Sequence, residues 1–177
     1  MAGRTPAEAV NAFIEPLGKA VSCLTNAVVN VGGGYHPSPE PHVLALNDGV
    51  AIPISTDLFM FVSQHYRIVE DVESRGPWKV TVVGYVYSLR NAARQELISY
   101  QWHPTGRSPI TFPHFHLGPG SRIGDERVAR AHLPSGRIAP QSFLRLLITE
   151  FGVLPRRADW DAVLTQTQAA LAEWGWP

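Results

Sequence analysis

Two histidines separated by one residue are the clearest candidates for chemistry in this sequence. His114 and His116 lie in the segment 112–118, FPHFHLG. Alternate residues of a strand point the same way, so both imidazoles would stand on one face while Phe115 and Leu117 point to the other. Two imidazoles on one face can act as a general acid and base, as a pair of metal ligands or as an anion site.

Four further residues are candidates to join this pair. His103 ends the preceding predicted strand, and Arg107 lies in the loop that follows. His132 and Arg137 flank the turn in the segment 131–137, AHLPSGR, which would lie near the histidines if the next helix packs back on the sheet. Histidines and arginines with no acidic cluster nearby favour acid–base chemistry on a phosphate, in which histidine transfers the proton and arginine stabilises the phosphoryl oxygens. The prediction is a metal-independent site that needs no cofactor.

A metal site is the alternative. If a metal is bound, the ligands would be His114, His116 and His132, and their order with Glu126 faintly resembles the cupin pattern. The glycine-rich stretches between these residues look like loop rather than the second strand of that pattern. Cys23 has no Cys–His signature, and no nucleophile elbow, phosphate-binding loop or dinucleotide fingerprint occurs.

The middle of the chain predicts an antiparallel meander that would carry these residues. The expected strands are 58–69, 78–89, 97–103 and 110–117. In the second of them, Tyr85 and Tyr87 share one face, while Val82 and Val86 share the other. A short hairpin of 42–46 with 50–54 is expected around a central Asn-Asp-Gly turn.

Helices are expected at both ends of the chain. The segment 5–8, TPAE, is an N-cap signature, and apolar residues follow in steps of three and four as far as Val28. Pro16 should kink or split this helix. Two more helices are expected at 140–151 and 158–174. The fold class is therefore α+β: an antiparallel β-meander of about four to six strands, with an N-terminal helix and two C-terminal helices packed against the sheet.

Length and composition describe a single folded domain. The 177 residues are 45% hydrophobic and 17% charged. The chain divides into an N-terminal helical segment, 1–31, a loop or hinge rich in Gly and Pro, 32–41, and an α+β domain, 42–177. A single cysteine excludes a disulfide scaffold and favours a cytoplasmic location. We expect no membrane association, since neither a spanning apolar run nor a signal-peptide pattern occurs.

The net charge of zero hides an asymmetry between the two halves of the chain. Residues 1–75 carry a net charge of −4 and residues 76–177 carry +4, and thirteen of the fifteen basic residues are arginine. Guanidinium groups prefer forked contacts with phosphate or carboxylate. The basic half can therefore attract RNA or another anion, or dock on the acidic half.

The run from Trp78 to Leu117 resembles the small toxins of the TumE type. The shared features are a Tyr-x-Tyr strand at 85–87, a return strand, and clustered histidines at 114–116. The resemblance implies the toxin of a toxin–antitoxin pair whose antitoxin is a helix-turn-helix protein. The segment 132–160 also resembles uncharacterised actinobacterial proteins.

Three hypotheses of function remain open. The first is a small intracellular toxin-like enzyme, a ribonuclease or other phosphoester-acting enzyme, with RNA as its partner. The second is a non-catalytic interaction or assembly subunit, which binds an antitoxin, another protein or a second copy of itself through the N-terminal helix and the Trp-Gly-Trp segment 174–176. The third is a metal-dependent enzyme with histidine ligands.

Overall fold

An antiparallel sheet in meander order carries the fold. The computed structural model describes residues 2–71, 77–105 and 108–172. Within these ranges nine strands pair along the path β2-β3-β5-β6-β7-β8-β9, with β1 on β6 and β4 on β5. The strands are β1 (Ala2–Gly3), β2 (Val29–Gly32), β3 (His42–Leu46), β4 (Ile52–Pro53), β5 (Phe59–Glu70), β6 (Trp78–Arg90), β7 (Glu96–Trp102), β8 (His114–Leu117) and β9 (Leu133–Pro134). Short edge pairings account for the strands beyond the four to six expected.

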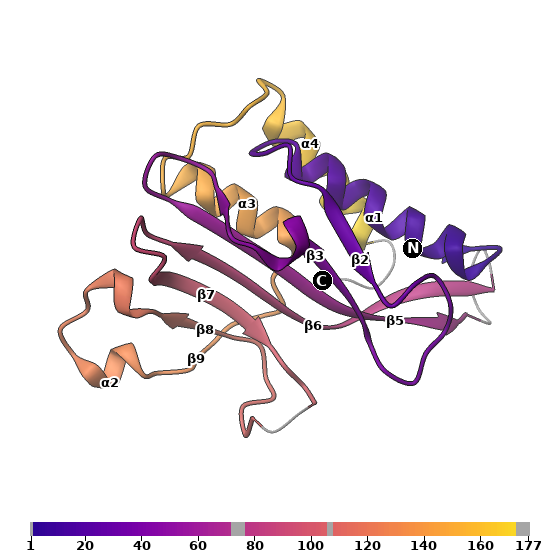
Figure 1. Ribbon diagram of the computed structural model, residues 1–177, viewed down its shortest axis with the longest axis horizontal. Coiled ribbons are helices and arrows are strands. Elements are labelled where there is room, and N and C mark those ends of the chain that lie inside the picture. The colour runs from indigo at the N-terminus through magenta and orange to yellow at the C-terminus, as the bar shows by residue number, and fades with distance from the viewer. Residues whose placement is uncertain (1, 72–76, 106–107, 173–177) are drawn as a thin grey trace.

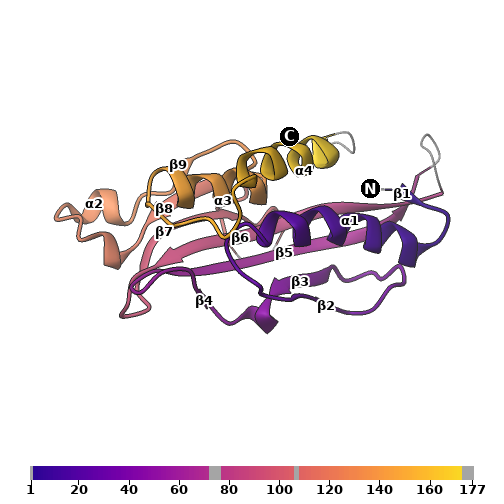
Figure 2. The ribbon, with the colours of Figure 1, turned by 90° about the horizontal axis from the view of Figure 1, so that it is seen from above.

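Three of the helices form a layer on one face of this sheet. The helices are α1 (Pro6–Val21), α2 (Glu126–Ala129), α3 (Pro140–Thr149) and α4 (Trp160–Ala172). Figures 1 and 2 show α1, α3 and α4 gathered on one side of the sheet, with α2 apart from them near β8 and β9. The expected α+β class, with helices from both ends of the chain against a meander, is therefore observed.

Aromatic side chains identify the face of the sheet that the helices cover. The Tyr87 ring stacks on Phe143 of α3 at 5.7 Å between centroids, and Tyr66 contacts Phe13 of α1 at 5.6 Å. Residues of β5 alternate between buried and partly exposed along most of its length, as a strand with one core face should. The opposite face of the sheet is therefore available for polar side chains.

The N-terminal helix is shorter than its apolar stripe predicts. It begins at the Thr5 N-cap, whose hydroxyl accepts a hydrogen bond from the Glu8 amide, and it ends at Val21 rather than near Val28. Pro16 lies within the helix, which runs through it unbroken, because tertiary packing of its buried side chain compensates for one missing amide donor. Residues 29–31 belong to β2, so the sheet begins inside the segment predicted to be helical.

The predicted hairpin of 42–46 with 50–54 does not form. Strands β3 and β4 each pair with β5 instead, through Val43 opposite His65 and Ile52 opposite Met60. The turn residues Asn47 and Asp48 have φ angles of 49° and 54° within a short 3-10 turn. Since β5 has twelve residues, both short segments can pair along the same strand.

A β-bulge in β6 reverses which side chains point to each face of the sheet. His65 pairs with Gly84 and Tyr66 pairs with Val82, which leaves Val83 as the extra residue. Val82 therefore joins Tyr85 in the core, whereas strict alternation predicted that the two would lie on opposite faces. Strand β8 also begins at His114, four residues later than predicted.

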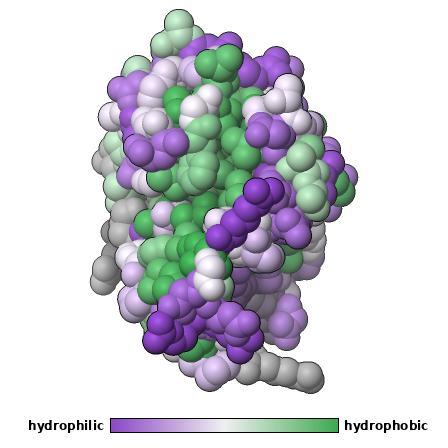
Figure 3. Space-filling view, turned by 90° about the vertical axis from the view of Figure 1, so that its left-hand side faces the viewer, coloured by the Kyte–Doolittle hydropathy of each residue, from purple (hydrophilic) through white to green (hydrophobic). Residues whose placement is uncertain are grey.

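The surface combines apolar and polar areas. A band of hydrophobic side chains crosses the end of the molecule drawn in Figure 3, with hydrophilic side chains beside it. None of the helices in the described ranges has the length and apolarity that crossing a bilayer requires. The proposed Trp-Gly-Trp partner segment, 174–176, lies outside the described residues.

Candidate functional site

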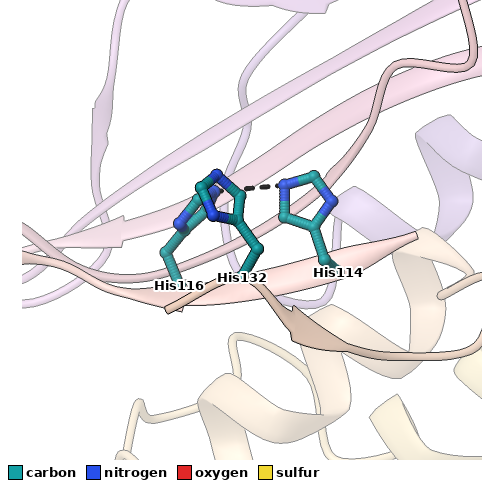
Figure 4. Close-up of side chains that lie close together, drawn as sticks. All are labelled: His114, His116 and His132. Carbon is teal, nitrogen blue, oxygen red and sulfur yellow. Dashed lines mark hydrogen bonds between the residues drawn. The ribbon is translucent and has the colours of Figure 1, made fainter. Parts of the chain in front are cut away.

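Three histidines meet where β8 and β9 pair. His114 and His116 belong to β8, opposite Gln101 and Ser99 of β7. His132 immediately precedes β9, whose two residues pair with 114 and 115. Figure 4 shows the three imidazoles turned toward one another from these two segments. The turn 131–137 therefore lies beside the histidine strand, as its position before α3 predicts.

The histidines occupy the face of the sheet that the helices leave open. Phe115, between them in sequence, contacts Tyr100 at 5.7 Å, and Tyr100 contacts Phe143 of the helix layer. Alternation along β8 then places His114 and His116 on the opposite face. The two side chains lie side by side, as the H-x-H spacing predicts.

The three rings are close enough for their nitrogens to share one ion. The ring centroids are 4.8 Å apart for His114 and His116, 5.1 Å for His114 and His132, and 4.5 Å for His116 and His132. Each ring offers a nitrogen, and these three atoms lie within 4.8 Å of one another. Exposure rises from buried His114 to partly buried His116 and exposed His132, so the group opens to solvent on one side.

A backbone carbonyl fixes the tautomer of His114. Its Nδ1 lies 2.8 Å from the carbonyl oxygen of Phe112, which can only accept, so Nδ1 carries the hydrogen and donates. The lone pair is then on Nε2, which lies 3.1 Å from Nε2 of His116. A hydrogen-bonded Nδ1 that leaves Nε2 as the ligand atom is the usual arrangement of metal-binding histidines.

The environment keeps His116 uncharged at neutral pH. The pKa of His116 is lowered to about 4. Burial is the main cause, and the charges of His114, His132 and His103 add to it. The pKa of His103 is also lowered, first by burial and then by the charges of His65 and His114. Neutral imidazoles with available lone pairs are the form that binds a metal.

None of the other predicted site residues that the structure describes belongs to this cluster. His103 follows the end of β7 and does not belong to the group of three that can share an ion. Arg137 lies with its guanidinium carbon 4.1 Å from the Trp102 ring centroid. Glu126 is exposed in α2 and pairs with Arg130, so the cupin-like order does not bring it to the histidines. Arg107 lies outside the described residues.

Two polar residues of β7 extend the site beyond the predicted set. Ser99 and Gln101 face the histidines in register, and the Gln101 side-chain amide donates to the Ser99 hydroxyl at 3.0 Å. Glu96 also bonds to Ser99, and burial raises the pKa of Glu96 despite that bond and the nearby Arg90 charge. The alternation of Ser99, Gln101 and His103 along one strand face is the sequence signal for this polar row.

The geometry suits one tetrahedral ion with an open position. Zinc bound by imidazole nitrogens at about 2.0 Å requires nitrogens roughly 3.3 Å from each other. His114 and His116 are already near this separation, and a nitrogen of exposed His132 lies within 4.8 Å of both. Three protein ligands leave a fourth position for water, which is the pattern of catalytic zinc sites.

No protein-family model, curated protein or solved structure matches this chain. The resemblance to TumE-type toxins therefore stays a prediction from the sequence.

Proposed function

We propose that the protein is a metal-dependent hydrolase that binds one divalent transition-metal ion, zinc by ligand type, through His114, His116 and His132. The observation that carries this proposal is the convergence of three imidazole nitrogens within 4.8 Å on the open face of the sheet. Imidazole ligands suit zinc and other late transition metals better than magnesium or calcium, which prefer oxygen.

The electrostatics favour metal binding over acid–base catalysis by the same residues. A general acid or base works best when its pKa lies near the working pH. His116, with a pKa of about 4, would hold almost no proton at neutral pH and would be a weak base. The same low pKa helps a metal ion, which does not have to displace a proton from this ring.

The chemistry follows from the open fourth position. A zinc ion lowers the pKa of its bound water to about 7, which supplies hydroxide at neutral pH. The exposed side of the cluster, at His132, admits a substrate to that position. A zinc ion held by His114, His116 and His132 would in this way supply a nucleophile for the hydrolysis of a phosphodiester, whose leaving oxygen would take up a proton from solvent. Arginines in the basic half of the chain favour an anionic substrate.

A chromogenic phosphodiester tests this function. We expect purified protein loaded with zinc to hydrolyse bis(p-nitrophenyl) phosphate, a chelator to abolish the activity, and added zinc to restore it. His116→Ala should reduce turnover by about a hundredfold or more, whereas His36→Ala, an exposed histidine outside the cluster, should match wild type. Hydrolysis that is unaffected by chelator, or retained by His116→Ala, would overturn the proposal.

A second candidate is the metal-free ribonuclease of a toxin-like protein. The observation in its favour is the 3.1 Å contact between the Nε2 atoms of His114 and His116, which a single shared proton accounts for. This function requires cleavage of RNA that resists chelator and is lost in His114→Ala and His116→Ala. An antitoxin would be its partner, and inhibition of that cleavage by a helix-turn-helix protein would support the toxin assignment.

A further inference from the structure

Strands β1 and β7 both pair with the same edge of β6, and a gap in the sheet, here called the notch, lies between them. Strand β7 reaches β6 only as far as Trp102 opposite Tyr85, and β1 pairs with β6 at Trp78 and Lys79. No described strand occupies that side of β6 from 80 to 84. A pocket of about 320 Å³ opens there. Its lining includes Val83 of β6, Trp102 at the end of β7 and Pro104 just after that strand.

Two arginines line this pocket without an acidic partner. Arg67 comes from β5, opposite Thr81, and Arg137 comes from the segment between β9 and α3. None of the described lining residues is acidic, and neither guanidinium forms an ion pair with a described carboxylate. Two uncompensated positive charges that face one cavity favour an anion there.

The position of Arg137 is set before any ligand binds. Its guanidinium stacks on the Trp102 ring at 4.1 Å, and Trp102 is itself almost buried beside Tyr85. The next residue, Ile138, donates its amide to the Tyr85 hydroxyl at 3.1 Å. A guanidinium held over an aromatic face still presents its N–H edges, and such preorganisation reduces the entropy lost on binding.

The lining favours a phosphate group. Thr81 and Thr105 add hydroxyl donors to the two guanidinium groups, which suits a tetrahedral dianion with several acceptor oxygens. A volume of about 320 Å³ also lies at the lower end of small-molecule sites. We propose that this Arg67–Arg137 pocket binds a terminal phosphate monoester.

The pocket lies beside the chain segment that carries His103, and His103 continues the polar row of Ser99 and Gln101 that faces the histidine cluster. His103 lies between pocket residues Trp102 and Pro104, and its imidazole is close enough to His114 to be affected by that charge. If the proposed hydrolase function holds, a phosphate in the pocket would anchor a substrate whose other end reaches the metal. The substrate class is then a small molecule or nucleotide with a terminal phosphate beside the scissile phosphodiester, and this step alone rests on the proposed function.

Calorimetric titration of the metal-free protein tests the pocket separately from the metal. We expect chelator-treated wild-type protein to bind ribose 5-phosphate, and inorganic phosphate more weakly, but not ribose. Arg67→Gln and Arg137→Gln should each raise the dissociation constant about tenfold or more, since each removes a charged donor. Arg94→Gln is the matched control, because Arg94 also stacks on an aromatic ring, Phe59, but lies outside the pocket lining.

The outcomes separate this proposal from the proposed hydrolase. Binding retained in His116→Ala and lost in the two pocket variants would support the pocket even if zinc does not bind. Binding that requires zinc would place the anion on the metal and overturn the pocket. The pocket is also overturned if wild type binds no ribose 5-phosphate, or if both pocket variants, shown to be folded by near-ultraviolet circular dichroism, bind as wild type does.

Discussion

The carbonyl of Phe112 decides which nitrogen of His114 can bind a ligand. It holds the hydrogen on Nδ1 and leaves Nε2 toward His116, so the buried histidine is oriented by backbone alone. Ser99 and Gln101 line the same face on the neighbouring strand, and Glu96 extends this polar row. The polar groups of Glu96, Ser99 and Gln101 therefore affect the stability of the fold as well as the surroundings of the histidines.

The ionisation of Glu96 should oppose folding. Because burial raises its pKa in the folded protein, the folded state prefers the neutral acid, and the cost of ionisation appears as the pH rises above 4.5. Glu96→Gln, which resembles the neutral acid, should therefore raise the free energy of unfolding at pH 7. Urea denaturation should show that this gain disappears at pH 3.5. Glu126→Gln, in an exposed surface pair, should change stability little at either pH. If Glu96→Gln makes the protein less stable than wild type at pH 7, this assignment is contradicted.

Sequence periodicity is informative about individual residues where the strand is regular. It placed His114 and His116 on one face correctly, because β8 contains no bulge. It failed for Val82, since one extra residue in β6 reverses the alternation. Nothing local in the sequence signals the contact between Arg137 and Trp102, which depends on how β9 returns to the sheet.

At the scale of elements, the end of β8 depends on a close backbone approach. A side chain at Gly118 would place its Cβ 2.4 Å from the Glu96 carbonyl oxygen. Gly118→Ala should therefore separate β8 from β7 and reduce the free energy of unfolding by about 2 kcal/mol or more. Gly124→Ala, where a Cβ would meet nothing within 4 Å, serves as the control and should be close to neutral. Equal thermal stability of the two variants would show that this approach is not tight.

The segment that carries His132 and Arg137 is tied to the sheet at two points. The Ser135 amide donates to the Pro113 carbonyl at 2.9 Å, and the Ile138 amide donates to the Tyr85 hydroxyl. Tyr85→Phe removes the second acceptor and should cost about 1 kcal/mol in the free energy of unfolding. It should also weaken zinc binding, because His132 belongs to the loosened segment. Tyr35→Phe, at a half-exposed position, should alter neither quantity in denaturation and zinc titration. Unchanged stability in Tyr85→Phe would contradict the role of this hydrogen bond.

The elements were predictable where local signals and tertiary packing agree. The long strands β5 and β6 are rich in aromatic and β-branched residues, and the bounds of both were predicted within about a residue. The prediction of a hairpin of 42–46 with 50–54 was wrong because both segments pair with β5. The local Asn-Asp-Gly pattern carries no information about pairing with a strand further along the chain.

In the whole molecule, the apolar stripe of α1 packs into the hydrophobic core. Phe13, Leu17 and Val21 are buried in the core cluster that also contains residues of the sheet, α3 and α4. A partner at this helix, whether an antitoxin or a second copy, would therefore have to contact its polar side. The assembly hypothesis from the sequence stays a prediction that size-exclusion chromatography can test.

Loss of the α1 contact should destabilise the whole fold. Leu17 is 1% exposed, so Leu17→Ala should reduce the free energy of unfolding by about 3 kcal/mol through lost burial and a cavity. Leu154→Ala, at a residue that is 85% exposed, should have almost no effect. Chemical denaturation measures both. A small loss in Leu17→Ala would mean that α1 packs loosely and is available to a partner.

The fold class was predictable from the sequence, whereas the choice of chemistry was not. The strand and helix periodicities of the sequence predict an α+β meander. The proposal of metal rather than acid–base chemistry depends on the hydrogen bond from His114 to Phe112 and on the low pKa of His116, both of which need the folded arrangement.

Calorimetric titration of the metal-free protein with zinc decides whether His114, His116 and His132 form a metal site. We predict a single site with about one equivalent of zinc per chain, and a loss of affinity of about a hundredfold or more in His114→Ala, His116→Ala and His132→Ala. His36→Ala should bind zinc as wild type does. No zinc binding by folded wild-type protein, or a site that survives all three substitutions in the cluster, would contradict the account.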